Sequence, residues 1–124
     1  MHSEIHARIL IIDDNDLNRK LFRAILESND IEVLEAKNAE NGIELIRQQR
    51  LDLILMDIQL PGMDGLEATK IIRRDTDLAA IPIIALTGNA MYGDDQIAFD
   101  AGCNGYITKP INLSSFMRTV KSFL

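Results

Sequence analysis

Three acidic residues stand where two apolar, strand-like segments of this chain end. Asp13 and Asp14 follow the apolar run of residues 8–12, and Asp57 closes the run of residues 52–57. The carboxyl ends of parallel strands lie at one edge of an open sheet, so these side chains are expected to converge there. Crowded carboxylates raise each other's proton affinity unless a cation joins them. Hard oxygen ligands in this number favour Mg²⁺, with Mn²⁺ as a substitute.

Two further strand ends carry the other groups that phosphoryl transfer requires. Thr87 follows the run of residues 82–86, and Lys109 follows the run of residues 104–108. A carboxylate such as Asp57 can attack a phosphoryl group, while a hydroxyl and an ammonium stabilise the charge on its oxygens. Each residue taken singly is an ordinary turn or solvated residue. The four kinds of group together are hard to obtain from independent turn chemistry.

Strand-like and helix-like segments alternate along the whole chain, which favours an α/β fold with a parallel sheet and helices on both faces. Right-handed crossovers leave few topologies for five such units, and fold analogy favours the flavodoxin-like strand order 2-1-3-4-5. This order puts the first and third strands side by side, so the three acids share one crevice. The predicted strands cover residues 8–12, 31–35, 52–57, 82–86 and 104–108, and the predicted helices cover residues 16–28, 39–48, 65–74, 90–101 and 113–124.

Local signals predict where the helices begin and end and which side chains they bury. Asn38 and Asn112 are predicted to cap the second and last helices, and Gly102 is predicted to end the fourth. Arg19 and Arg23 fall on the polar side of the first helix and are left for water. The predicted core positions of that helix are Leu17, Leu21, Phe22, Ile25 and Leu26.

The composition predicts one soluble domain over residues 1–124. Hydrophobic residues make up 47% and charged residues 26% of the 124 positions, which is ordinary for a globular protein. The net charge of −6 argues against nucleic-acid binding, and no apolar run reaches the length of a membrane span. Cys103 is the single cysteine, which suits a reducing cytoplasm, and His2 and His6 belong to a polar tail.

The order of these groups resembles the response regulator receiver family, and the resemblance covers essentially the whole chain. It is strongest to stand-alone, single-domain regulators of cell division. It implies a two-component or phosphorelay switch that takes a phosphoryl group from a histidine kinase or a histidine phosphotransfer protein and then binds a downstream protein target. Such a switch takes part in its own phosphorylation and slow autodephosphorylation and is not otherwise an enzyme. The residues that carry the resemblance are Asp13, Asp14, Asp57, Thr87, Lys109 and Pro110.

The resemblance also implies a set of Mg²⁺ ligands. Asp14 and Asp57 would bind the ion directly, Asp13 would act through a metal-bound water, and the main-chain carbonyl of Gln59 would complete the protein's share. Asp57 would be the phosphoacceptor. Gln59 and Asn89 flank the site as neutral amides, and neither is a good general base, so we predict a moderately long-lived phosphoryl group.

The remaining implied roles concern the switch and its output. Thr87 would donate its hydroxyl to a phosphoryl oxygen, Lys109 would supply positive charge, and the Lys109–Pro110 peptide bond would be cis. Tyr106 would swing inward after phosphorylation; its alternative role is a partly exposed aromatic residue that covers the sheet edge. The chain would be a monomer or a weak phosphorylation-dependent dimer. The expected partner face comprises Met91, Tyr92, Tyr106 and Phe116.

Three other interpretations stay open at this point. The chain could be a receiver excised from a hybrid histidine kinase or a larger regulator. It could be a phosphohydrolase with Asp57 as nucleophile, but haloacid-dehalogenase-like enzymes need a second acid two residues later, where this chain has Gln59. It could also bind partners without phosphorylation, although every expected site residue is present.

Overall fold

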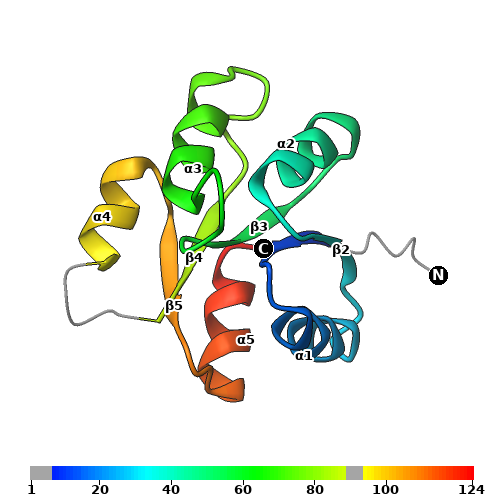
Figure 1. Cartoon of the computed structure of the whole chain (residues 1–124). Helices are drawn as coiled ribbons and strands as arrows, with labels where there is room; N and C mark the ends of the chain where they lie inside the picture. The colour runs from blue at the N-terminus through cyan, green and yellow to red at the C-terminus, as the bar shows by residue number, and fades with distance from the viewer. Residues whose placement is uncertain (1–6, 89–93) are drawn as a thin grey trace.

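The computed structural model describes residues 7–88 and 94–124, and within them strands and helices alternate (Figure 1). The described strands are all parallel and lie in the order β2-β1-β3-β4-β5, which confirms the predicted topology. The predicted start of the fourth helix at residues 90–93 and the tail with His2 and His6 lie outside the described residues. The elements are β1 (Arg8–Ile12), α1 (Asp16–Glu27), β2 (Glu32–Ala36), α2 (Ala39–Gln48), β3 (Leu53–Asp57), α3 (Gly65–Arg74), β4 (Ile83–Thr87), α4 (Asp94–Ala101), β5 (Gly105–Thr108) and α5 (Leu113–Ser122).

The two faces of the sheet carry separate cores, because successive side chains of a strand point to opposite faces. Leu10 and Ile12 pack under α2, α3 and α4, whereas Ile9 and Ile11 pack under α1 and α5 (Figure 1). The central strands β1, β3 and β4 are covered on both faces, which explains their nearly unbroken apolar runs. Among the described residues, none of the helices has the length and apolar character of a membrane span.

Asparagine and aspartate side chains fix the helix starts. The side chains of Asn15, Asn38, Asp64 and Asn112 each accept a hydrogen bond from the main-chain N–H three residues later. The predicted caps Asn38 and Asn112 are therefore confirmed. Gly102, after the last residue of α4, has a φ of +116°, a conformation that favours glycine, and this confirms the predicted end of that helix.

The predicted core face of α1 is wrong in three places. Phe22 and Leu26 are buried as expected, but Leu17 is 75% and Leu21 is 46% exposed. Arg19, expected in water, is only 6% exposed. The guanidinium lies under the turn between β1 and α1, where acceptors from three parts of the chain offset the cost of burying it.

Phe116 of α5 is fully buried, which corrects its expected place on a partner face. Its ring stacks on Phe22 of α1, with ring centroids 5.4 Å apart and an interplanar angle of 10°. The two rings join the helices that cover one face of the sheet, so Phe116 belongs to the core and cannot present its side chain to another protein.

Candidate functional site

The structure brings Asp13, Asp14 and Asp57 together at the carboxyl edge of the sheet. Strands β1 and β3 are hydrogen-bonded neighbours, with Ile12 opposite Met56, so the residues that follow emerge side by side. One ligand oxygen from each carboxylate lies within 4.8 Å of the others. Asp13 and Asp57 are buried, whereas Asp14 is exposed. The cluster is therefore open to solvent on the side of Asp14.

Lys109 is the cation that faces this cluster. Its Nζ lies 3.1 Å from Asp57 Oδ2 and 3.2 Å from Asp13 Oδ2, so one ammonium donates to both buried carboxylates. The main-chain N–H of Lys109 donates to the carbonyl of Thr87 at 2.7 Å, and the Lys109–Pro110 peptide bond is cis. One ammonium against three carboxylates leaves an excess of two negative charges.

The electrostatics of Asp57 reflect its burial. Burial, and to a lesser degree the charge of Asp13, raises the pKa of Asp57 above its ordinary value. The main-chain N–H of Gln59, 2.8 Å from Asp57 Oδ1, and the ammonium of Lys109 act in the opposite direction but do not cancel the rise. Burial alone would lower the pKa of Lys109, but the hydrogen bond and charge of Asp57 and the charge of Asp13 raise it. Lys109 therefore stays protonated at neutral pH.

Thr87 ends β4 on the neighbouring strand and is almost completely buried. It faces Thr108 of β5 in the sheet register, and Leu86 before it faces Asp57. The hydroxyl-bearing residue thus stands one strand from the acidic cluster, beside the segment that leads to Lys109. This is the strand-end arrangement that the sequence predicts.

Sequence reasoning missed the role of Gly65, the first residue of α3. A Cβ at this position would lie 2.2 Å from the carbonyl oxygen of Asp57 and 2.7 Å from the Cα of Ile58. Only glycine lets the start of α3 approach the segment after Asp57 this closely. The pair Asp64-Gly65 was a visible turn signal, but sequence alone does not show which strand end the turn would pack against.

The side chain of the expected switch residue Tyr106 lies against α4. Its side chain is 37% exposed and makes an edge-to-face contact with Phe99 of α4, with ring centroids 6.0 Å apart. Phe99 is itself 42% exposed, so Phe99 and Tyr106 form an apolar surface over α4 and β5. Met91 and Tyr92, expected on this surface, and Asn89 lie outside the described residues.

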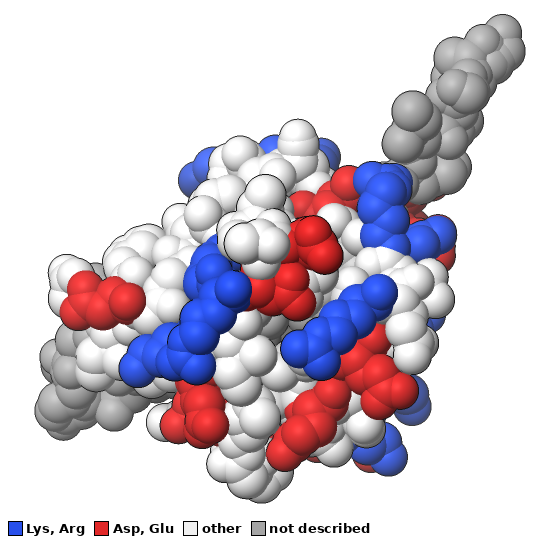
Figure 2. Space-filling view, turned by 90° about the horizontal axis from the view of Figure 1, so that it is seen from above, with Lys and Arg blue, Asp and Glu red and all other residues white. Residues whose placement is uncertain are grey.

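A second apolar surface lies directly beside the acidic cluster. Leu21 lines a pocket together with Asn18, Lys109, Pro110 and Ile111. The exposed Leu17 precedes Asn18 on α1. On the face drawn in Figure 2, acidic and basic side chains are interspersed, and the described residues there form no broad basic surface.

Comparisons with known proteins agree with this geometry. Residues 9–121 match the family described as the response regulator receiver domain. The polar-differentiation response regulator DivK of Brucella anthropi is 46% identical over 116 residues, which are 94% of each chain. The receiver domain of a sensor histidine kinase from Pseudomonas aeruginosa, solved with a magnesium ion in its active site cleft, has a TM-score of 0.89 and 34% identity over 96% of this chain and 98% of that one. A Saccharomyces cerevisiae receiver domain, solved with its histidine phosphotransfer protein, has a TM-score of 0.87 and 31% identity over 95% of this chain and 88% of that one.

Proposed function

The chain belongs to the response regulator receiver family of two-component signalling, and we propose that Asp57 is the residue that accepts the phosphoryl group. The position of Asp57 carries this proposal. Its carboxylate shares a cluster with Asp13 and Asp14 and accepts a hydrogen bond from the ammonium of Lys109. Asp57 is itself the last residue of the central strand β3, whereas Asp13, which also binds Lys109, lies in the turn after β1.

The proposed transfer is a direct displacement at phosphorus. A carboxylate oxygen of Asp57 attacks the phosphoryl group of a phosphohistidine, a P–O bond forms as the P–N bond breaks, and the electron pair of that bond returns to the imidazole nitrogen. Lys109, 3.1 Å from Asp57, stays within reach of the charge on the transferred group. Thr87 donates its hydroxyl to a phosphoryl oxygen. Because burial raises the pKa of Asp57, a cation at the cluster favours the ionised nucleophile.

The carboxylates fit a hard divalent cation. Their oxygens lie within 4.8 Å of one another, and Lys109 neutralises only part of their charge. We assign Asp14 and Asp57 as direct ligands, Asp13 as a ligand through water and the carbonyl of Gln59 as the main-chain contribution. Mg²⁺ bound there supplies positive charge to the phosphoryl oxygens, and Mn²⁺ substitutes for it.

We assign the docking site of the phosphodonor to the apolar surface of Leu17 and Leu21 beside Lys109. These leucines are exposed next to the acidic cluster, where a donor histidine must approach Asp57. The Saccharomyces cerevisiae neighbour was solved with a histidine phosphotransfer protein. A histidine kinase or a histidine phosphotransfer protein is therefore the expected donor, and an apolar patch on it would cover these side chains.

We assign the output to the apolar surface of Phe99 and Tyr106. A phosphoryl group on Asp57 adds negative charge and acceptor oxygens that draw the hydroxyl of Thr87 toward it. Tyr106, now exposed against Phe99, turns into the space that Thr87 leaves, which changes the surface offered to a downstream protein. The free chain is expected to be monomeric, with at most a weak dimer after phosphorylation.

We propose that the chain is a single receiver domain over residues 1–124 that acts in the cytoplasm as a phosphoacceptor switch and not as a phosphohydrolase. The position two residues after Asp57 holds Gln59, whose amide cannot protonate a leaving group. The buried free thiol of Cys103 is consistent with a reducing compartment. Steady turnover of an ordinary phosphomonoester would contradict the assignment as a switch.

Intact-protein mass after incubation with acetyl phosphate tests the assignment of Asp57. We expect one Mg²⁺-dependent phosphoryl adduct on the wild type and none on Asp57→Asn. Asp52→Asn, at the other end of the same strand, is the matched control and should keep the adduct. An adduct of equal yield on Asp57→Asn would place the acceptor elsewhere, and no adduct on the wild type would leave a module that binds without phosphorylation.

A further inference from the structure

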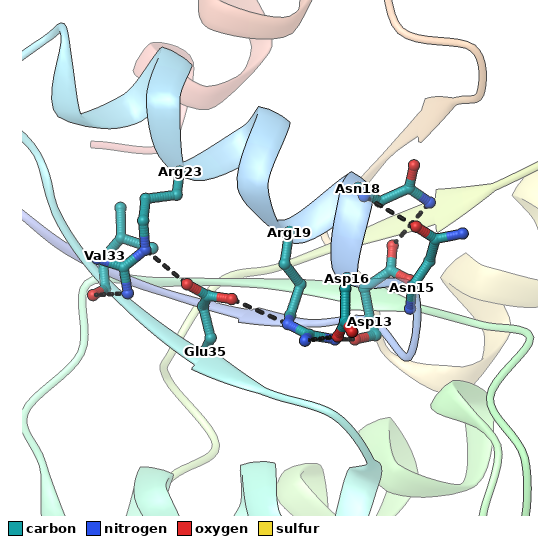
Figure 3. A network of polar contacts seen from close by, with 8 residues as sticks. All are labelled: Asp13, Asn15, Asp16, Asn18, Arg19, Arg23, Val33 and Glu35. Carbon is teal, nitrogen blue, oxygen red and sulfur yellow. Dashed lines mark hydrogen bonds and ion pairs between the residues drawn. The ribbon is translucent and has the colours of Figure 1, made fainter.

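Arg19 is a buried arginine in direct contact with the main chain of the acidic cluster. It is only 6% exposed, and its Nη1 donates to the carbonyl oxygen of Asp13 at 2.6 Å (Figure 3). Its Nε donates to Glu35 at 2.9 Å, and its Nη2 pairs with Asp16 at the start of α1. A buried guanidinium is tolerated only when such acceptors surround it, so its position is closely determined.

Glu35 ties Arg19 to the edge strand of the sheet. Its Oε1 binds Arg19, and its Oε2 accepts from Nε of Arg23 at 2.5 Å, while Arg23 also donates to the carbonyl of Val33 at 3.2 Å (Figure 3). Burial opposes the ionisation of Glu35, but the hydrogen bonds from Arg23 and Arg19 outweigh it and lower its pKa. Glu35 is therefore ionised at neutral pH and holds Arg19 from the side of β2.

The side chain of Asp13 is held independently of its carbonyl. Oδ1 accepts from the N–H of Asn15 at 2.9 Å, and Oδ2 accepts from Lys109 at 3.2 Å and from Asn18 at 3.4 Å. The carbonyl group that Arg19 holds belongs to the peptide that links Asp13 to Asp14. Its orientation therefore determines where the exposed carboxylate of Asp14 can lie.

We propose that Arg19 is a positioning residue for the metal site, which holds the Asp13–Asp14 peptide so that both carboxylates face Asp57. This inference rests on the proposed function, because it takes the three carboxylates as the Mg²⁺ site. Arg19 contacts neither the ion nor the phosphoryl group; it acts through the main chain. A lysine could keep the charge, but its donors all sit on one nitrogen and could not reach acceptors that bind three separate nitrogens of the planar guanidinium.

Calorimetric titration with Mg²⁺, without any phosphodonor, tests the inference. Arg19→Gln should raise the Kd for Mg²⁺ about tenfold, the lower end of the loss typical when a partner of a metal ligand is removed. Arg23→Gln is the matched control. This substitution removes the second arginine that binds Glu35, and Arg23 makes no contact with Asp13. Glu35 binds Arg19 through its other carboxylate oxygen, so that hydrogen bond remains. Its Kd should stay at the wild-type value, even if its stability falls.

A merely structural role predicts a different result. Thermal unfolding in EDTA reports stability, and circular dichroism confirms that each variant is folded before titration. If Arg19→Gln and Arg23→Gln change the Kd equally, or if Arg19→Gln loses stability with an unchanged Kd, the inference is overturned. Arg19→Lys is the second variant, and we expect its Kd to lie between those of the wild type and Arg19→Gln.

Phosphorylation by acetyl phosphate separates this inference from the proposed function. At saturating Mg²⁺, Arg19→Gln should approach the wild-type rate, with the half-maximal rate displaced to higher Mg²⁺ in proportion to its Kd. A lower maximal rate at an unchanged Mg²⁺ requirement would contradict positioning of the ligands. If the wild type gives no adduct, the proposed function fails, whereas the calorimetric Kd values still decide whether Arg19 sets metal affinity.

Discussion

Replacing Asp57 with asparagine should stabilise the metal-free protein at neutral pH and remove its stabilisation by Mg²⁺. The carboxylate of Asp57 is buried, shares its surroundings with the acids Asp13 and Asp14, and has Lys109 as its cation. Burial, together with the charge of Asp13, raises its pKa above the ordinary value. Asparagine has a similar shape and no charge, so it avoids this cost but cannot bind the ion as a carboxylate does.

The sign and size of the effect follow from linkage. Because the pKa of Asp57 is raised in the fold, the stability that this residue contributes is full below the ordinary aspartate pKa and is lost as the pH rises through the folded value. The variant should therefore gain on the order of 1 kcal/mol at neutral pH, about the repulsion between two like charges 4 Å apart in a well-solvated site. The gain should fade in acid. Mg²⁺ at a hundred times its Kd should stabilise the wild type by about 2.7 kcal/mol, or roughly 10 °C in Tm.

Thermal unfolding followed by circular dichroism, in EDTA and in Mg²⁺ from mildly acidic to neutral pH, measures both effects. Asp52→Asn is the control, because Asp52 accepts from the N–H of Arg8 at 2.8 Å at the far end of β3. It should lose stability and keep the response to Mg²⁺. The reasoning is refuted if Asp57→Asn is less stable than the wild type in EDTA at neutral pH, or if Mg²⁺ raises the Tm of both proteins equally.

Three further substitutions probe separate parts of the structure. Lys109→Ala removes the ammonium that joins Asp57 and Asp13. Because the Lys109 side chain is 24% exposed, the loss of unfolding free energy in EDTA should be about 1–3 kcal/mol, below the value for a fully buried pair. Urea unfolding measures this loss, and an unchanged stability would contradict the bridging role. Phe116→Ala should lower the free energy of unfolding by about 3–5 kcal/mol in the same assay, because it empties a fully buried core position. A loss typical of a surface residue would argue against this burial. Leu17→Ala, at a position 75% exposed, should change stability by less than about 0.5 kcal/mol. It should slow transfer from a phosphorylated histidine phosphotransfer protein but not from acetyl phosphate, and equal slowing of both would exclude a docking role.

The strands, the helix starts and the acidic residues could be predicted because they depend on local signals, whereas the strand order that puts β1 beside β3 came from fold analogy. Apolar runs with polar ends fix the strands, and Asn38 and Asn112 fix two helix starts. A parallel sheet then gathers the residues that follow its strands at one edge, so Asp13 and Asp57 could be placed together without knowledge of any side-chain contact.

The face of a helix could not be predicted with the same certainty, because helical spacing does not give the width of the buried stripe. Leu17 and Leu21 have the spacing of core residues but lie outside the stripe that Phe22 and Leu26 define. The burial of Arg19 could not be predicted from helical spacing. Its acceptors come from the end of β1, the start of α1 and strand β2, and the fold must exist before they meet.

These departures give α1 three different roles around its circumference. Phe22 packs on Phe116 and binds the helix to the core, Arg19 holds the main chain of Asp13, and Leu17 faces solvent beside the acidic cluster. These contacts are made with different partners, so we expect stability, the proposed metal affinity and the proposed donor recognition to change independently along a single helix. A lysine or glutamate in place of Leu17 would improve solubility at little cost to the fold. The exposed leucine is thus better explained by a binding role than by folding, since the core does not use it.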